Sequence, residues 1–333
     1  MNMTLEYPSI KTGFSLVEML IAIALMAIMT VSVMPQLRYL LDFQASADTR
    51  NSLNELLAGL SSAYQANVSS IEADANPEIN FGAAGTMTQA VAKAGSRCNA
   101  SANSFLPWAS FTGRSAATLY KDGYGAPLCV LINPQASVLL DGFPLYYHVV
   151  AFVSTGANNI LDAGTTLDAA GNLNLGGDDM GVVFDGRAFA IQAYNTTSSR
   201  IQSLSQALQA YYLARYQSDP TRSSSIDYWS NGAGSPDTSR WDASNPGNLI
   251  AYQTVATPMY TGTGSDMTTA LGVSRNDVTD GYGNIVQFEN ASQAVRSPVN
   301  TVSDMAIPPY TAMISTTLPG NIRYSESVVG INN

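Results

Sequence analysis

A run of 21 residues, from Phe14 to Met34, constrains this 333-residue chain more than any other feature, because it is almost entirely apolar. Only four of its residues fall outside the apolar class: Ser15, Glu18, Thr30 and Ser32. A helix of this length is about 30 Å long, enough to cross the hydrocarbon core of a bilayer. The run therefore predicts a membrane helix close to the N-terminus, as in a signal anchor or a secretory signal peptide.

Three features argue against an ordinary signal peptide. The segment before the run is polar, and its side-chain charge is near zero because Glu6 balances Lys11, whereas a secretory leader is normally basic. The nearest small-residue cleavage site beyond the run, at 45–47, is too distant. Glu18 lies inside the run, where an ionised carboxylate costs about 3 kcal/mol near the membrane centre and usually has a partner and a function.

The residues Gly13-Phe14-Ser15-Leu16-Val17-Glu18, followed by the apolar run, resemble the class III signal of type IV pilins and type II secretion pseudopilins. In that family a membrane aspartyl peptidase, the prepilin peptidase, cuts after the glycine and N-methylates the new N-terminal residue. The resemblance implies cleavage between Gly13 and Phe14 and N-methylation of Phe14. It also makes Glu18 the fifth residue of the mature chain, where the family glutamate pairs with the N-terminal amine of a neighbouring subunit. We therefore expect other pilin subunits and prepilin peptidase as partners.

Composition excludes several function classes. The chain has 15 Lys and Arg against 25 Asp and Glu, a formal net charge of −10, which leaves no electrostatic footprint for duplex nucleic acid. One His and two Cys are too few for a multi-His metal site or a four-Cys zinc site. The sequence also lacks the phosphate-binding, zinc-protease and nucleophile-elbow motifs of common enzymes. We therefore expect a protein that is not an enzyme.

Helical periodicity continues beyond the apolar run. Pro35 predicts a kink or the end of the membrane helix, and both alternatives stay open. A one-sided apolar stripe follows, at Leu53, Leu56, Leu57, Leu60 and Tyr64. The composite helix, Phe14 to Tyr64, would be about 75 Å long. A second helix with the same spacing is predicted from 201 to 212, capped by Ser198 or Ser199, and a strand is predicted over 146–153.

A four-residue motif occurs twice and decides the predicted architecture. Asp-Gly-Tyr-Gly at 122–125 recurs at 280–283, each time as a turn leading into a strand, although chance similarity in a glycine-rich chain is the alternative. The predicted fold class is α+β, with a long N-terminal helix packed on an antiparallel sheet and a second pilin-like α+β module in tandem. The predicted division is a leader at 1–13, a transmembrane and assembly helix at 14–35, and modules at 36–190 and 191–333.

Cys98 and Cys129 are the only cysteines, and in an oxidising compartment they most simply form a disulfide. Free thiols, or a catalytic dyad with His148, are the alternatives. His148 lies in an apolar strand, where a packed role is the usual one.

An acidic, glycine-rich segment at 154–185 is the candidate metal site. Hard oxygen ligands on such a loop suit Ca²⁺, which takes six to eight oxygens. The first choices are Asp162, Asp168, Asp178 and Asp179, although no EF-hand spacing is present and a solvated acidic loop is the alternative. No other cofactor is expected.

The resemblance implies a structural subunit of a type IV pilus or a related filament. Its bulky double head favours a minor pilin over a major one. One alternative is a pseudopilin of a type II secretion or DNA-uptake machine. The other is a pilus-associated adhesin whose second module recognises a surface or sugar. The expected location is the bacterial inner membrane, with a single span and the head outside the cytoplasm, and then a pilus or a periplasmic filament.

Overall fold

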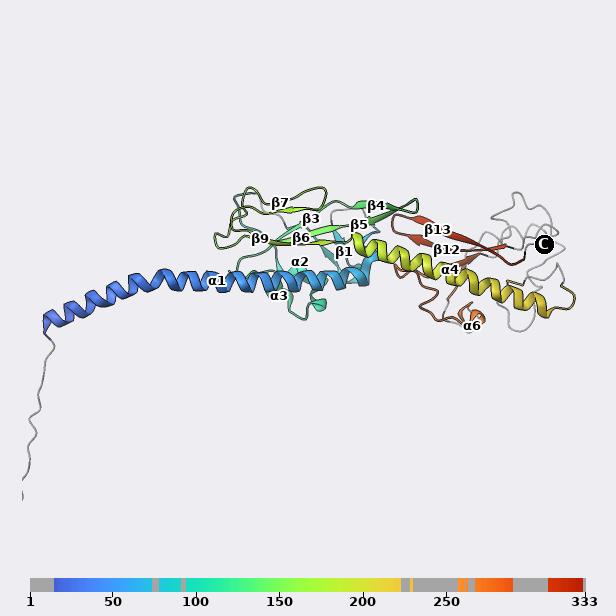
Figure 1. Cartoon of the computed structure of the whole chain (residues 1–333), viewed down its shortest axis with the longest axis horizontal. Helices are drawn as coiled ribbons and strands as arrows, with labels where there is room; N and C mark the ends of the chain where they lie inside the picture. Colours follow the sequence, from blue (N-terminus) through green and yellow to red (C-terminus); the bar gives the residue numbers. More distant parts are fainter. Residues whose placement is uncertain are drawn as a thin grey trace, which may run out of the picture.

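The structure is a computed structural model, and it describes residues 15–73, 78–90, 94–222, 228–229, 257–260, 262, 267–289 and 311–331. A long helix, α1, projects from an elongated head in which two α+β units follow one another along the long axis (Figure 1). The predicted α+β class, with a long N-terminal helix and antiparallel sheets, is confirmed.

Helix α1 (Leu16–Ile71) has 56 residues and continues through Pro35, so the proline does not end it. The helix curves along its N-terminal half (Figure 1). It extends beyond Tyr64, the predicted end, and contains one non-helical residue, Asn67, with φ −129°. The predicted stripe is the buried face, because Leu53, Leu56 and Leu60 are at most 2% exposed.

The first unit consists of α1 from Ala45 onward and the elements from β1 to β9. Its elements after α1 are, in chain order, β1 (Ile79–Asn80), η1 (Gly82–Ala84), β2 (Thr86–Met87), α2 (Ala102–Phe105), η2 (Ala109–Phe111), α3 (Ala116–Leu119), β3 (Cys129–Ile132), β4 (Ala136–Leu140), β5 (Phe143–Tyr147), β6 (Val149–Ser154), β7 (Thr166–Leu167), β8 (Leu173–Asn174) and β9 (Met180–Asp185). The main sheet is antiparallel in the order β3-β6-β9, and three two-stranded sheets, β1-β2, β4-β5 and β7-β8, surround it.

The central strand of this sheet, β6, is buried along its whole length, because both faces of the sheet are covered. Side chains of a strand alternate between faces. Val150 and Phe152 therefore join the core under α1, whereas Ala151 and Val153 join a smaller core beneath the loops between β6 and β9. The sheet thus holds α1 on one side and these loops on the other.

The second unit consists of α4 (Arg187–Ser218) from Ile201 onward and the described elements after it. These are β10 (Thr257–Pro258), α6 (Met267–Leu271), β11 (Gln287–Glu289), β12 (Thr311–Leu318) and β13 (Ile322–Val329). The four strands form an antiparallel sheet in sequence order. The buried residues of α4, Ile201, Leu204, Leu208 and Tyr212, each lie 148 positions after a buried residue of α1, at Leu53, Leu56, Leu60 and Tyr64.

Two elements have bounds in the structure that differ from those predicted from the sequence. The strand predicted over 146–153 is split at His148, because β5 pairs with β4 whereas β6 pairs with β3 and β9. The second helix begins at Arg187 rather than near Ser198, since its first turns pack Ala190, Ala193 and Tyr194 into the core of the first unit. Such tertiary packing overrides the weak helix propensity of the Asn- and Thr-containing turn that follows. The predicted division between 190 and 191 falls inside α4 and stays a prediction.

The repeated Asp-Gly-Tyr-Gly motif docks on a helix in both units with the same hydrogen bonds. In the first unit the Gly123 N–H donates to Thr49 Oγ1 (3.0 Å), and the Thr49 hydroxyl donates to the Ala45 carbonyl (2.8 Å). In the second unit Gly281 donates to Thr197 Oγ1 (2.9 Å), and Thr197 donates to the Ala193 carbonyl (2.9 Å).

The aspartate of each motif closes the turn and ties it to a strand. Asp122 Oδ1 accepts the Tyr124 N–H (3.0 Å), and Oδ2 accepts the Ser154 hydroxyl (2.6 Å). Asp280 makes the corresponding bonds to the Tyr282 N–H (2.9 Å) and the Thr316 hydroxyl (2.7 Å). Burial raises the pKa of both carboxyl groups. The repeat seen in the sequence is therefore a repeat of tertiary contacts.

Side chains of the two units pack against one another at the junction between the units. The Tyr324 ring of β13 lies 5.3 Å from Phe143 of β5 and 5.9 Å from Tyr194 of α4, between ring centroids. Leu318 and Tyr282, from the second unit, are buried in the core of the first. The two units therefore share part of one hydrophobic core.

Candidate functional site

The structure pairs Cys98 with Cys129 in a disulfide, as predicted, with 5.0 Å between the Cα atoms. Cys129 is the first residue of β3, and both cysteines lie in the small core on the far side of the sheet from α1. The bond ties the segment before α2 to the central sheet. Because both sulfur atoms are in the disulfide, the alternative of a dyad with His148 is wrong.

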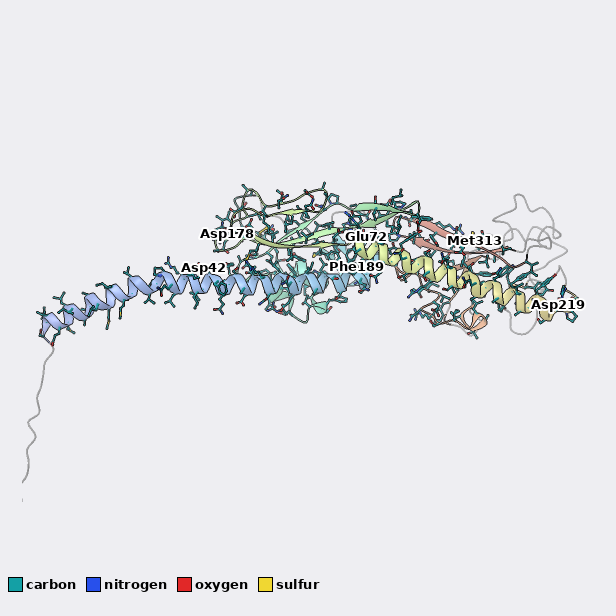
Figure 2. The ribbon with its side chains drawn as sticks, viewed as in Figure 1. Asp42, Glu72, Asp178, Phe189, Asp219 and Met313 are labelled. Atoms are coloured by element: carbon teal, nitrogen blue, oxygen red, sulfur yellow. A yellow bond between two sulfur atoms is a disulfide. The ribbon has the colours of Figure 1, made fainter. Side chains whose placement is uncertain are left out.

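Three of the four predicted metal ligands come together. Asp162, Asp178 and Asp179 each place a carboxylate oxygen within 4.8 Å of the others, in the loops between β6 and β9. Asp168 is not part of this group, because its Oδ1 accepts the backbone N–H groups of Ala170 (2.9 Å) and Asn172 (2.8 Å) beside the β7-β8 hairpin. Figure 2 shows Asp178 at the end of the head from which α1 emerges.

Backbone hydrogen bonds orient these carboxylates. Asp178 Oδ2 accepts the Ala157 N–H (2.7 Å), and Asp162 Oδ2 accepts the Asp178 N–H (3.3 Å). Gly177 adopts φ +50°, and a Cβ atom there would lie 1.9 Å from Asp162 Oδ2. Only glycine allows the chain to pass so close to this carboxylate.

Asp179 is the buried member of the cluster, with 7% of its surface exposed. Its Oδ2 accepts the Asp162 N–H (2.9 Å) and the Thr165 hydroxyl, whereas its Oδ1 is buried without a partner in the described part of the chain. Burial raises the pKa of Asp179, and the neighbouring charges of Asp162 and Asp178 raise it further. A cation among the three carboxylates would relieve both effects.

Ser15 and Glu18 shape the start of α1. Ser15 Oγ accepts the N–H groups of Val17 (3.2 Å) and Glu18 (3.4 Å), and Glu18 Oε2 accepts the Ser15 N–H (3.0 Å). This is a capping box, which satisfies amides that the first turn leaves free. Gly13 and Phe14, the predicted processing residues, lie outside the described residues. The structure places Glu18 in the first turn of α1.

The first half of α1 projects from the head (Figure 1). The side chains described between residues 15 and 44 are all exposed, although many are large and apolar. Among the described residues, α1 is the one helix long and apolar enough to cross a membrane, with a mean hydropathy of 2.4 in its most apolar window.

Residues 9–34 match the family model of the prokaryotic N-terminal methylation motif. The chain has the N-terminus of a type IV prepilin or pseudopilin. The match ends at residue 34, before α1 enters the head. No curated protein and no solved structure was found to match the chain.

One buried polar cluster of the head was not predicted from sequence. Glu72, which follows α1, and His148, between β5 and β6, are both fully buried, and His148 Nδ1 lies 3.0 Å from each carboxylate oxygen of Glu72. Glu72 also accepts the Tyr64 hydroxyl and the Gln135 side-chain amide (3.0 Å to Oε2). Burial, followed by the charge of Glu72, raises the pKa of Tyr64 well above its usual value.

This cluster joins three elements at the junction of the two units. It links the end of α1 to the start of β6, and the His148 carbonyl accepts the Gly186 N–H (3.0 Å) at the start of α4. A His in an apolar strand and a Glu after a helix carry no spacing signal, so sequence reasoning could not pair them.

Proposed function

We propose that the chain is a minor-pilin-like structural subunit of a type IV pilus or a related filament. In this proposal prepilin peptidase cuts between Gly13 and Phe14 and methylates Phe14. The helix then anchors the subunit in the inner membrane and afterwards packs in the filament. The observation that carries the proposal is the methylation motif on a helix that begins with an apolar, exposed segment.

The exposed apolar surface supports assembly through α1. Leu16, Ile21, Met29 and Leu40 are each more than half exposed, which is unfavourable in water but is satisfied by lipid or by other helices. The first contacts with the head occur near Asp42, whose carbonyl accepts the Tyr124 hydroxyl (3.3 Å). The head therefore leaves the preceding turns of α1 available to neighbours.

Glu18 is the proposed register residue. A carboxylate surrounded by apolar helices needs a cationic partner, and the methylated amine of Phe14 from the next subunit supplies one. The capping bond to the Ser15 N–H keeps the Glu18 carboxylate at the helix start. An amine and a carboxylate from adjacent subunits then pair only when the helices have the correct axial offset.

We expect Glu18→Ala to lower incorporation of the subunit into sheared filaments about tenfold or more, because an unpaired charge at an apolar interface costs several kcal/mol. Glu18→Gln should lower incorporation to a similar extent, since glutamine retains a hydrogen-bond acceptor but not the charge. Thr30→Ala, which replaces another polar residue of the same helix, is the control and should assemble normally. Normal incorporation of Glu18→Gln would contradict the pairing. Quantitative immunoblots of the filament and membrane fractions measure the ratio of assembled to unassembled subunit.

The large head supports a minor role. After loss of the 13-residue leader, the mature chain would have 320 residues, and a double head in every position would crowd a filament lattice. The same N-terminus also serves a pseudopilin of a secretion or DNA-uptake machine. An adhesin is the other alternative, and it would require a ligand site in the head.

We propose further that Asp162, Asp178 and Asp179 hold Ca²⁺. The three oxygens within 4.8 Å and the unpartnered Asp179 Oδ1 support this assignment. Ca²⁺ takes six to eight oxygen ligands, and backbone carbonyls and water would complete the shell. Asp168, which lies outside the group, is dropped from the proposed ligand set.

Calcium is expected to raise the melting temperature of the full chain by about 5 °C or more over a chelator control, if its concentration is 100 times the dissociation constant. Asp179→Asn should abolish the shift, and Asp168→Asn should keep it. Because burial raises the pKa of Asp179, this carboxyl group without calcium binds more protons in the folded chain than in the unfolded chain just above pH 4. The contribution of Asp179 to stability should therefore fall as pH rises through that window, and calcium should remove this contribution to the fall but not the contributions of Asp122 and Asp280. An equal shift in Asp168→Asn and Asp179→Asn would contradict the site.

A further inference from the structure

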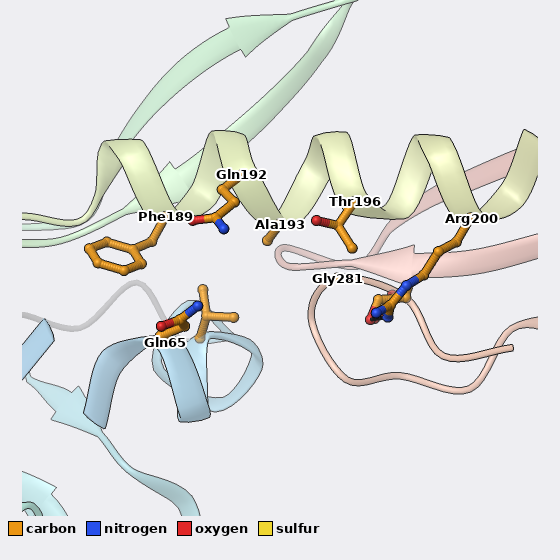
Figure 3. A pocket seen from close by; sticks show the side chains of 9 residues that line it. Gln65, Phe189, Gln192, Ala193, Thr196, Arg200 and Gly281 are labelled. Carbon is orange, nitrogen blue, oxygen red and sulfur yellow. Dashed lines mark hydrogen bonds between the residues drawn. The ribbon is translucent and has the colours of Figure 1, made fainter. Parts of the chain in front are cut away.

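A groove of about 280 Å³ separates the end of α1 from the underside of α4 at the junction of the two units. Its volume lies just below the roughly 300–1,000 Å³ range of small-molecule sites, which often form between structural units. Figure 3 shows its lining, with α4 above, the end of α1 below and the second Asp-Gly-Tyr-Gly turn at one end.

One face of α4 supplies most of the lining. Phe189, Gln192, Thr196 and Arg200 follow one another at helical spacing, and Figure 3 shows their side chains on the groove side of α4. From Phe189 to Arg200 the helix rises by roughly 16 Å. The groove therefore suits an elongated ligand better than a single compact ring.

Polar groups in the groove have hydrogen-bonding capacity to spare. The side chains of Gln65, Gln192 and Thr196 make no hydrogen bond within the described residues, and both glutamines are exposed. Two amides and a hydroxyl offer donors and acceptors together, which is the pattern that matches the hydroxyl groups of a sugar. Phe189 adds an apolar wall, and its ring is held by Phe184 and Tyr64 at centroid distances of 5.6 and 5.9 Å.

Arg200 adds a positive charge in a fixed position. Its Nη1 donates to the carbonyls of Thr279 (2.7 Å) and Asp280 (3.2 Å), which anchors the guanidinium to the turn. Its Nε and Nη2 have no hydrogen-bond partner among the described residues. These two nitrogens form one edge of the guanidinium, the edge that binds both oxygens of a carboxylate.

The nearby carboxylates do not occupy this edge. Both oxygens of Asp280 are taken by bonds from its own turn and from Thr316. Asp277 accepts from the Ser274 N–H (2.8 Å) and hydroxyl (2.7 Å) and makes no ion pair with Arg200 in the described part of the chain. Within the described part of the chain, the Nε–Nη2 edge of Arg200 is therefore open to an outside carboxylate.

We propose that this groove binds a short acidic oligosaccharide, with a uronic-acid carboxylate on the Nε–Nη2 edge of Arg200 and the sugar ring at the far end of the oligosaccharide against Phe189. Gln65, Gln192 and Thr196 bind ring hydroxyls. The site goes beyond filament assembly, because it uses no residue of the first half of α1. It gives the head a ligand. If no binding were found, the assembly proposal would be unaffected.

Trigalacturonate is the probe, titrated by calorimetry into the full chain in detergent micelles. The expected result is saturable binding in the millimolar range or tighter. The fully methyl-esterified trisaccharide, which lacks the charge, should bind about tenfold more weakly. Maltotriose, a neutral trisaccharide, should also bind more weakly than trigalacturonate.

Arg200→Lys keeps the charge but loses the planar edge, so trigalacturonate should bind about tenfold more weakly. Gln192→Ala changes an exposed side chain that no fold contact requires, and it should weaken binding about threefold or more. Gln202→Ala, on an exposed face of α4 outside the groove, is the matched control and should bind as the parent does. Absence of saturable binding, equal binding of the ester, or an unchanged affinity in both Arg200→Lys and Gln192→Ala would overturn the proposal.

Discussion

Replacing Gly281 by alanine is expected to destabilise the second unit by about 3 kcal/mol or more. A Cβ atom at this position would lie 2.0 Å from the Ala193 carbonyl oxygen, and a backbone atom cannot rotate away as a side chain does. The turn would have to move off α4, which would break the bond from Gly281 to Thr197 and expose the buried Asp280. Overpacking against backbone belongs to the most costly class of single substitutions.

Hydrogen exchange followed by mass spectrometry localises this loss. Protection should fall at 267–289 and in α4 from the docking site at Ala193 and Thr197 onward, and less at 129–154 in the first unit. Gly283→Ala is the matched control in the same turn. Gly283 has φ +88° and no atom within 4 Å of its Cβ position, so the substitution should cost only about 1–2 kcal/mol of backbone strain. An equal effect of the two substitutions would contradict the docking contact.

Removing the Glu72 side chain, as Glu72→Ala, is expected to cost about 3–5 kcal/mol of the free energy of unfolding. Tyr64, His148 and Gln135 would each lose a buried acceptor. Unsatisfied buried donors carry their full desolvation penalty. Because the cluster joins α1, β6 and α4, both units should lose stability together.

Chemical denaturation of the full chain measures this loss, and an exposed ion pair on the same helix provides the comparison. Glu55 of α1 lies 2.8 Å from Arg114, with about half of each side chain exposed. Glu55→Ala should cost only about 0.2–1 kcal/mol. The loss from Glu72→Gln, which keeps a hydrogen-bond acceptor, should lie between the losses from Glu72→Ala and Glu55→Ala. A loss from Glu72→Ala no larger than that from Glu55→Ala would contradict a structural role for the buried cluster.

The sequence predicted those elements whose signals are local. The apolar stripe of α1 identified its buried face, and the repeated Asp-Gly-Tyr-Gly motif indicated two corresponding turns. The presence of only two cysteines, both in one predicted module, indicated that they pair with each other. In each case the signal lies in spacing or residue type, which the backbone geometry translates directly into position.

The missed features depend on contacts between distant segments. His148 splits the predicted strand because β5 and β6 pair in different sheets, and no residue near His148 signals that change. Helix α4 begins at Arg187 because Ala190 and Tyr194 fit the core of the first unit. Asp168 looked equivalent to Asp162 in the sequence, but its own hairpin supplies it with donors, whereas Asp162 faces Asp178 and Asp179.

The central claim is that this chain is a prepilin whose helix is released for assembly by cleavage. N-terminal mass spectrometry of the protein recovered from its native membranes tests this most directly. The account predicts a mature chain that begins with N-methylated Phe14 and retains Glu18 as its fifth residue. A chain that still begins at Met1 would contradict it, because Glu18 would then have no amine to pair with and α1 would be an ordinary membrane anchor.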